Sequence, residues 1–117
     1  IVMVIHANHA NELDAEVAET LAKLRGAGLT LLNQSVLLRG VNDDEESLAL
    51  LSDTLFRYGV MPYYLHLLDR VAGAAHFNVD EDRAANLLRG LRSRMPGYLI
   101  PRLVREVEGL PHKQPVS

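Results

Sequence analysis

Ile1-Val-Met-Val-Ile5, the first five residues, form a continuous apolar run in which every residue except Met3 is β-branched. Such a run is typical of a strand covered on both faces, as in a parallel sheet. Three further strand-like runs follow, separated by leucine-rich segments with helical spacing: 29–38, 60–68 and 98–107. The pattern predicts the order β-α-β-α-β-α-β, in which repeated right-handed crossovers give a parallel sheet with helices on its outer face.

Each predicted helix is preceded by residues that can cap it: Asn11 or Asp14, Asn42 or Asp43, and Asp80. The pattern fits two α/β architectures, an open doubly wound sheet and a sector of a (β/α) barrel. Both place functional residues at the carboxyl ends of the strands. Because no Gly-x-Gly-x-x-Gly motif follows the first run, a dinucleotide site is not indicated, and we expect a sector of a partial TIM-type (β/α) barrel.

The composition argues against several classes of function. With 12 Lys and Arg against 15 Asp and Glu, and no basic block, direct nucleic-acid binding is not supported. The chain has no cysteine, so its own thiolates cannot hold a disulfide or an iron–sulfur cluster. No apolar run approaches the roughly 20 residues of a membrane span, and the first run is too short for a signal peptide. We therefore expect a cytoplasmic protein that does not bind membranes.

The chain opens inside a predicted strand, which suggests a fragment of a longer protein. We expect residues 1–117 to be the carboxyl-terminal part of a barrel domain, with 108–117 as a tail that carries Lys113. An apolar first strand without charge or proline is also a template for pairing between chains. We therefore expect a homo-oligomer.

Four polar clusters are assigned to the ends of the strand-like runs, and together they predict one active-site rim. They are His6-Ala-Asn-His9, Asn33-Gln-Ser35, His66-Leu-Leu-Asp69 and Gly109-Leu-Pro-His-Lys113. A lysine on a turn just past a strand end suits an amine that bonds reversibly to a carbonyl group.

Each cluster also has a structural explanation. Lys113 could be a solvated tail residue, and Asp69 could form a turn. The amides of the second cluster could be a satisfied buried network or could contact a ligand. Tyr63 and its neighbours could be a half-buried aromatic strand. His6 and His9 diverge on a strand, so a metal site is disfavoured.

Five strings resemble the lysine 2,3-aminomutase family of radical S-adenosylmethionine (SAM) enzymes in order and spacing. They are His6-Ala-Asn-His-Ala-Asn-Glu12, Asn33-Gln-Ser-Val-Leu-Leu-Arg-Gly-Val-Asn-Asp43, Pro62-Tyr-Tyr-Leu-His-Leu-Leu-Asp69, His76-Phe77 and Gly97-Tyr-Leu-Ile-Pro101. The nearest resemblance in kind is to the enzyme that makes (R)-β-lysine for elongation factor P.

The resemblance implies an enzyme that uses SAM, pyridoxal phosphate (PLP) and a [4Fe-4S] cluster. Lys113 stands where the family binds PLP covalently, and His6 and Gln34 match residues that contact SAM. Tyr63 matches an aromatic residue that lines the radical site. The cluster's cysteine triplet is missing, and its place in the family would be before Ile1.

The substrate implied by the resemblance is L-lysine, because Asp69 and Glu106 match the acids that hold its ammonium groups. Asp44 replaces a zinc-binding cysteine of the longer family members, which favours the β-lysylation type. The chain alone is predicted to be inactive. Two alternatives stay open: a free lysine 2,3-aminomutase of β-lysine metabolism, and a non-catalytic half-barrel that binds a phosphorylated ligand or a partner chain.

Overall fold

The computed structural model describes residues 1–67, 79–105 and 114–115 of the chain. Its helices and strands, in chain order, are β1 (Val2–Ile5), η1 (Ala10–Glu12), α1 (Ala15–Gly26), β2 (Thr30–Leu37), α2 (Glu45–Arg57), β3 (Val60–Leu67), α3 (Glu81–Arg92), η3 (Gly97–Leu99), β4 (Arg102–Arg105) and β5 (Gln114–Pro115).

The strands form one sheet in the order β1-β2-β3-β4-β5. The first four pair in parallel, whereas the two-residue strand β5, which the sequence did not predict, pairs antiparallel with β4. Because the order of β1 to β4 in the sheet equals their order in the chain, the winding never reverses. A doubly wound sheet requires such a reversal. The predicted sector of a (β/α) barrel is therefore confirmed.

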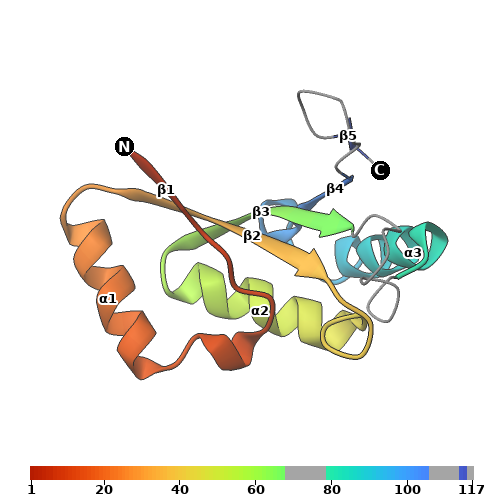
Figure 1. Ribbon diagram of the computed structural model, residues 1–117, viewed down its shortest axis with the longest axis horizontal. Helices are drawn as coiled ribbons and strands as arrows, with labels where there is room; N and C mark the ends of the chain where they lie inside the picture. The colour runs from red at the N-terminus through yellow and green to blue at the C-terminus, as the bar shows by residue number, and fades with distance from the viewer. Residues whose placement is uncertain (68–78, 106–113, 116–117) are drawn as a thin grey trace, which may run out of the picture.

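The helices share one face of the sheet. Leu31 and Leu37 point to the same side of β2, since they are an even number of residues apart. Leu31 belongs to a buried cluster with residues of α1 and α2, and Leu37 to a second one with residues of α2 and α3. Figure 1 shows α1 and α2 on the same side of the sheet. This helix-covered face holds the core of the described residues.

The opposite face of the sheet, which we call the open face, is only partly covered by the described residues. On β2 it presents Leu32, Gln34 and Val36, all half-buried, between fully buried neighbours. On β1, at the edge of the sheet, Val2 is 58% exposed. In the part of the chain that the structure describes, β1 is therefore an exposed edge strand, and its coverage on both faces in a longer protein stays a prediction.

Two expectations need correction. Strand β4 begins at Arg102, not at Tyr98, because Gly97–Leu99 forms a 3-10 turn. Pro101 lies between them and cannot donate a ladder hydrogen bond. The cap of α2 is Asp44, whose Oδ1 accepts from Ser47 N at 2.7 Å, not Asn42 or Asp43.

The starts of the other two helices agree with the prediction. Asp14, one of the two candidates for α1, accepts from Val17 N at 2.9 Å. Asp80 precedes α3, without a side-chain capping bond. The predicted strand ends beyond Leu67 and Arg105 lie outside the described residues.

Candidate functional site

Polar side chains meet at the carboxyl edge of the sheet, because β1 to β4 run in parallel. Ile5 at the end of β1 is in register with Asn33 of β2. His6 is the residue after Ile5, and Gln34 is the residue after Asn33, so His6 and Gln34 lie at the same level along the strand direction. The second cluster, Asn33-Gln-Ser35, lies inside β2 and not at its end, which corrects the expectation. Of the third cluster only His66 and Leu67 are described, and they are the last two residues of β3.

Three asparagines of this edge have a structural role. Asn33 is buried, and its Oδ1 accepts from Ala7 N at 2.9 Å while its Nδ2 donates to Ala7 O at 3.1 Å. Asn8 Oδ1 accepts from Val36 N at 2.9 Å. These bonds continue the pairing of β1 with β2 beyond Ile5, where the backbone ladder ends. The alternative of a satisfied network is therefore correct for Asn33.

Asn42 completes this set from the loop after β2. It is fully buried, with 0% exposure. Its Oδ1 accepts from Leu38 N at 2.7 Å, and its Nδ2 donates to Asn8 O at 2.8 Å and Val36 O at 2.9 Å. We call Asn8, Asn33 and Asn42 the asparagine clamp. One side chain thus links the segment after β1 to both β2 and its loop.

His9 also has a local structural role. Its Nδ1 accepts from Asn11 N at 3.1 Å, and Glu12 Oε2 accepts from His9 N at 2.8 Å, which together form a capping box. In the described part of the chain, no group of three or more His, Asp or Glu side chains is arranged to hold a metal ion.

The open face carries a different polar pair, Gln34 and His66. His66 Nε2 donates to Gln34 Oε1 at 3.0 Å, and both side chains are half-buried. The His66 ring meets the ring of Tyr64 edge-on at 6.0 Å between centroids. The rings of Tyr64 and Tyr63 are also in contact, with 4.4 Å between their centroids. Four side chains from two strands therefore form a continuous row, which we call the open-face row.

A β-bulge explains why neighbouring residues share this face. Asn33 is in register with Pro62, but Gln34 is in register with Tyr64, so Tyr63 is the extra residue. Consecutive residues of a regular strand point to opposite faces, whereas a bulge changes that phase. Tyr63 is 44% exposed and lies against Tyr64. His6, at the end of β1, is exposed.

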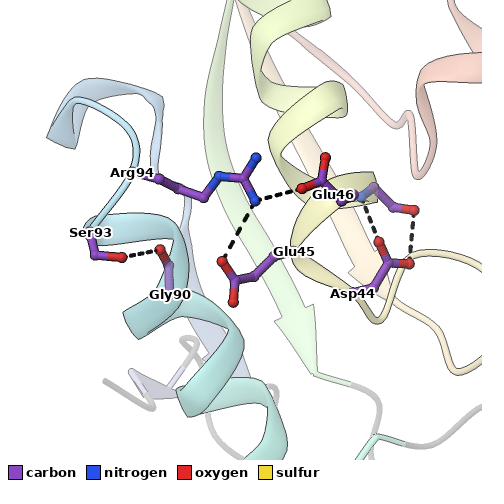
Figure 2. A network of polar contacts seen from close by, with 7 residues as sticks. Asp44, Glu45, Glu46, Gly90, Ser93 and Arg94 are labelled. Carbon is purple, nitrogen blue, oxygen red and sulfur yellow. Dashed lines mark hydrogen bonds and ion pairs between the residues drawn. The ribbon is translucent and has the colours of Figure 1, made fainter.

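The acidic run at the start of α2 has a structural explanation. Asp44 caps the helix, and bonds from the Ser47 backbone and hydroxyl lower the pKa of its carboxyl group. Figure 2 shows Arg94 reaching Glu46 Oε1 at 2.9 Å and Glu45 Oε1 at 3.7 Å. The bond to Glu46 and the charges of both glutamates raise the pKa of Arg94. Glu45 and Glu46 thus form an acidic first turn of α2, which the helix dipole favours.

Three of the predicted site residues, Asp69, Glu106 and Lys113, lie outside the described residues. The nearest described residue to Lys113 in the sequence is Gln114, which is in register with Arg105 at the end of β4. None of the helices that the structure describes is long and apolar enough to cross a membrane.

Comparison with known proteins identifies the family. No protein-family model matches the chain. It is 56% identical to the L-lysine 2,3-aminomutase of Escherichia coli (strain K12) over 117 residues, which are 100% of this chain and 34% of that protein. The chain belongs to the lysine 2,3-aminomutase family. The predicted resemblance is thus confirmed.

Other members of the family are more distant. The L-lysine 2,3-aminomutase of Clostridium subterminale is 38% identical over 95% of this chain and 27% of that protein. The glutamate 2,3-aminomutase of Clostridioides difficile (strain 630) is 38% identical over 82% of this chain and 23% of that protein. The chain therefore spans about a third or less of these relatives.

A solved structure shares the fold. A radical SAM methyltransferase from Sphaerobacter thermophilus matches 89% of this chain and 33% of its own with a TM-score of 0.59, at 19% sequence identity. This match supports the fold alone, a partial (β/α) barrel.

Sequence reasoning missed the roles of two members of this edge. It considered Asn42 as a helix cap, and it placed His66 in the predicted rim and in an aromatic strand without pairing it with Gln34. The signal for His66 was present, because a polar residue between Leu65 and Leu67 occupies the face opposite to those leucines.

Proposed function

We propose that this chain is the carboxyl-terminal third of a radical SAM enzyme that moves the α-amino group of L-lysine to the neighbouring carbon, giving β-lysine. The observation that carries the proposal is the 56% identity along all 117 residues to a protein named L-lysine 2,3-aminomutase. The open-face row supports it, because its polar pair Gln34 and His66 lies in the carboxyl-terminal halves of β2 and β3, and barrels of this type bind ligands toward the carboxyl ends of their strands.

The residues of the carboxyl edge fit a SAM ligand. Gln34 and His6 would contact it, since both are polar and each follows a member of the registered pair Asn33 and Ile5. Tyr63 and Tyr64 would supply apolar ring surface beside it. This chain offers no thiolate, so the ligands of a [4Fe-4S] cluster would come from another part of the protein.

PLP would be held by Lys113, and the two substrate ammonium groups would pair with Asp69 and Glu106. When bound, PLP supplies a π-system that lets an amino group migrate between adjacent carbons. The acids would desolvate and orient the substrate, because a buried ammonium group needs an anionic partner. A glutamate substrate has one fewer ammonium group and an additional carboxylate, which two acids would repel.

We also propose that the β-lysine formed is used to modify elongation factor P. This proposal rests on the resemblance to the shorter family type, including Asp44 in place of a cysteine. We further propose a cytoplasmic, homo-oligomeric enzyme. The free aminomutase of β-lysine metabolism would perform the same reaction, so only the fate of the product separates the two.

The test uses the complete protein loaded with iron, sulfide, PLP and SAM under reducing conditions. We expect it to convert L-lysine to β-lysine and to leave L-glutamate unchanged. Conversion of glutamate alone would contradict the substrate assignment, and conversion of neither would contradict the proposed function.

The PLP site is tested by trapping bound PLP with borohydride and locating it by peptide mass spectrometry. Lys113→Ala should abolish the trapped adduct. Lys23→Ala is the matched control, because Lys23 is the only other lysine of this chain and lies exposed on α1. An adduct that survives Lys113→Ala would show that PLP is bound elsewhere.

A further inference from the structure

We infer that His66 is a positioning residue, which fixes the side-chain amide of Gln34 so that its two N–H donors face the ligand on the open face. The inference rests on the proposed function, because it concerns SAM as that ligand. It assigns to His66 a role that acts through Gln34 and requires no contact between His66 and the ligand.

The first step is the chemistry of the pair. A glutamine side chain has an acceptor oxygen at one end of its amide and a donor NH2 group at the other. The 3.0 Å bond between His66 Nε2 and Gln34 Oε1 uses the acceptor end. This bond requires the imidazole to carry its proton on Nε2. The donors of Gln34 are then directed away from His66.

The second step is how the pair is held. Gln34 is in register with Tyr64, and Val36 is in register with His66. His66 is therefore two residues further along the sheet than Gln34, on the same face. The edge-on contact between Tyr64 and His66 restricts the rotation of the imidazole. Without the His66 bond, the amide of Gln34 could rotate by a half turn and present its oxygen.

The third step is the class of group that Gln34 would recognise. Two N–H donors in one plane bind an oxygen that accepts hydrogen bonds. SAM offers such oxygens in its carboxylate and in its ribose hydroxyl groups. A Gln34 with the opposite orientation would place its carbonyl oxygen against the carboxylate, which weakens binding.

The experiment measures the dissociation constant of SAM by equilibrium dialysis with the complete, cluster-loaded protein, without turnover. Gln34→Ala should raise it about tenfold, the equivalent of one lost hydrogen bond. His66→Leu should raise it by a similar factor, and should add nothing in the Gln34→Ala background. Tyr98→Leu is the control, because Tyr98 is 56% exposed on η3, which precedes β4, and should leave binding unchanged.

Conservative variants separate positioning from packing. In His66→Gln the amide nitrogen reaches about as far as Nε2 of histidine, so this variant should restore binding to within about twofold of the natural chain. His66→Asn carries the same amide on a shorter side chain and should bind as poorly as His66→Leu. Circular dichroism would check that each variant is folded.

A second ligand, 5′-methylthioadenosine, locates the recognised oxygen. If Gln34 binds the carboxylate, Gln34→Ala should not affect the binding of 5′-methylthioadenosine, which lacks that group. If Gln34 binds the ribose, the tenfold loss should persist with this probe.

Additive effects of His66→Leu and Gln34→Ala, or unchanged SAM binding in His66→Leu, would overturn the inference while the proposed function stands. If the natural protein does not bind SAM, both the inference and the proposed function are wrong.

Discussion

Replacing Asn42 by alanine should destabilise the chain by about 3 kcal/mol. The side chain is 0% exposed and makes three hydrogen bonds, to Leu38 N, Asn8 O and Val36 O. Each buried backbone group left without a partner costs about 1–3 kcal/mol. The surrounding groups are only partly buried, so water would replace some of the lost bonds, and the total falls well below the sum of the maxima.

Asn42→Asp tests the donor end of the Asn42 side chain separately. The carboxylate keeps an acceptor for Leu38 N but replaces the donor by an oxygen that faces two carbonyl oxygens, which are 2.8 and 2.9 Å from Nδ2 in the natural chain. We expect at least as large a loss as for alanine at pH 7. The new carboxyl group would have its folded-state pKa raised, so the penalty should shrink as the pH falls and the protonated acid regains a donor.

Urea denaturation followed by circular dichroism provides the measurement, with the free energy of unfolding compared at pH 7 and pH 4. Asn86→Ala is the control, because Asn86 is exposed on α3 and its side chain only accepts a bond from Arg89. We expect the control to lie within about 0.5 kcal/mol of the natural chain. If Asn42→Ala lost no more stability than Asn86→Ala, the clamp would not hold the segment after β1 in place.

The contacts between α2 and α3 give two further predictions. A Cβ on Gly90 would overlap the Glu45 carboxylate and displace it from Arg94 (Figure 2). In thermal denaturation we expect Gly90→Ala to raise the free energy of unfolding by up to about 1 kcal/mol when Glu45 is already alanine, and by about 0.5 kcal/mol less when Glu45 is present. Equal gains in the two backgrounds would contradict the contact. Capping bonds lower the pKa of Asp44 in the folded chain. The charge of Asp44 therefore stabilises the fold fully above its unfolded-state pKa of about 3.9, and this stabilisation is lost as the pH falls through the lower folded-state pKa. Asp44→Ala should cost about 1 kcal/mol at pH 7 and less near pH 2, where the protonated carboxyl group of the natural chain still accepts a bond but has lost its charge. Asp44→Asn should retain most of the cap at both values, and a loss in Asp44→Ala that did not change with pH would refute this.

The fold could be predicted because its signals are local and repeat along the chain. Apolar runs alternate with capped leucine-rich segments, and the consecutive strand order follows from right-handed crossovers. The caps were less certain, since Asn42, Asp43 and Asp44 are all good capping residues. Only the buried bonds of Asn42 assign it to the clamp and leave the cap to Asp44. Such long-range bonds leave no mark in a local pattern.

The adjacent residues Asn33 and Gln34 show how much of the site was predictable. Both are amides in one strand, and the sequence left open whether they contact a ligand. The alternation of β2 separates them, because Asn33 lies on the helix-covered face with Leu31 and Gln34 lies on the open face. The same reasoning would have assigned them from the sequence once the leucines were taken to mark the covered face.

Strict alternation fails on β3, and this failure is informative. Continued from Val60 and Pro62, it would turn His66 toward the helices and Leu65 toward the open face. The leucines at 65 and 67 are instead buried in the core, so the phase changes within the strand. The bulge at Tyr63 makes that change, and it is also what brings His66 to the same face as Gln34. β-Bulges are common next to active sites, where they redirect side chains. The bulge at Tyr63 thus creates the hydrogen-bonded pair on which the proposed ligand site depends.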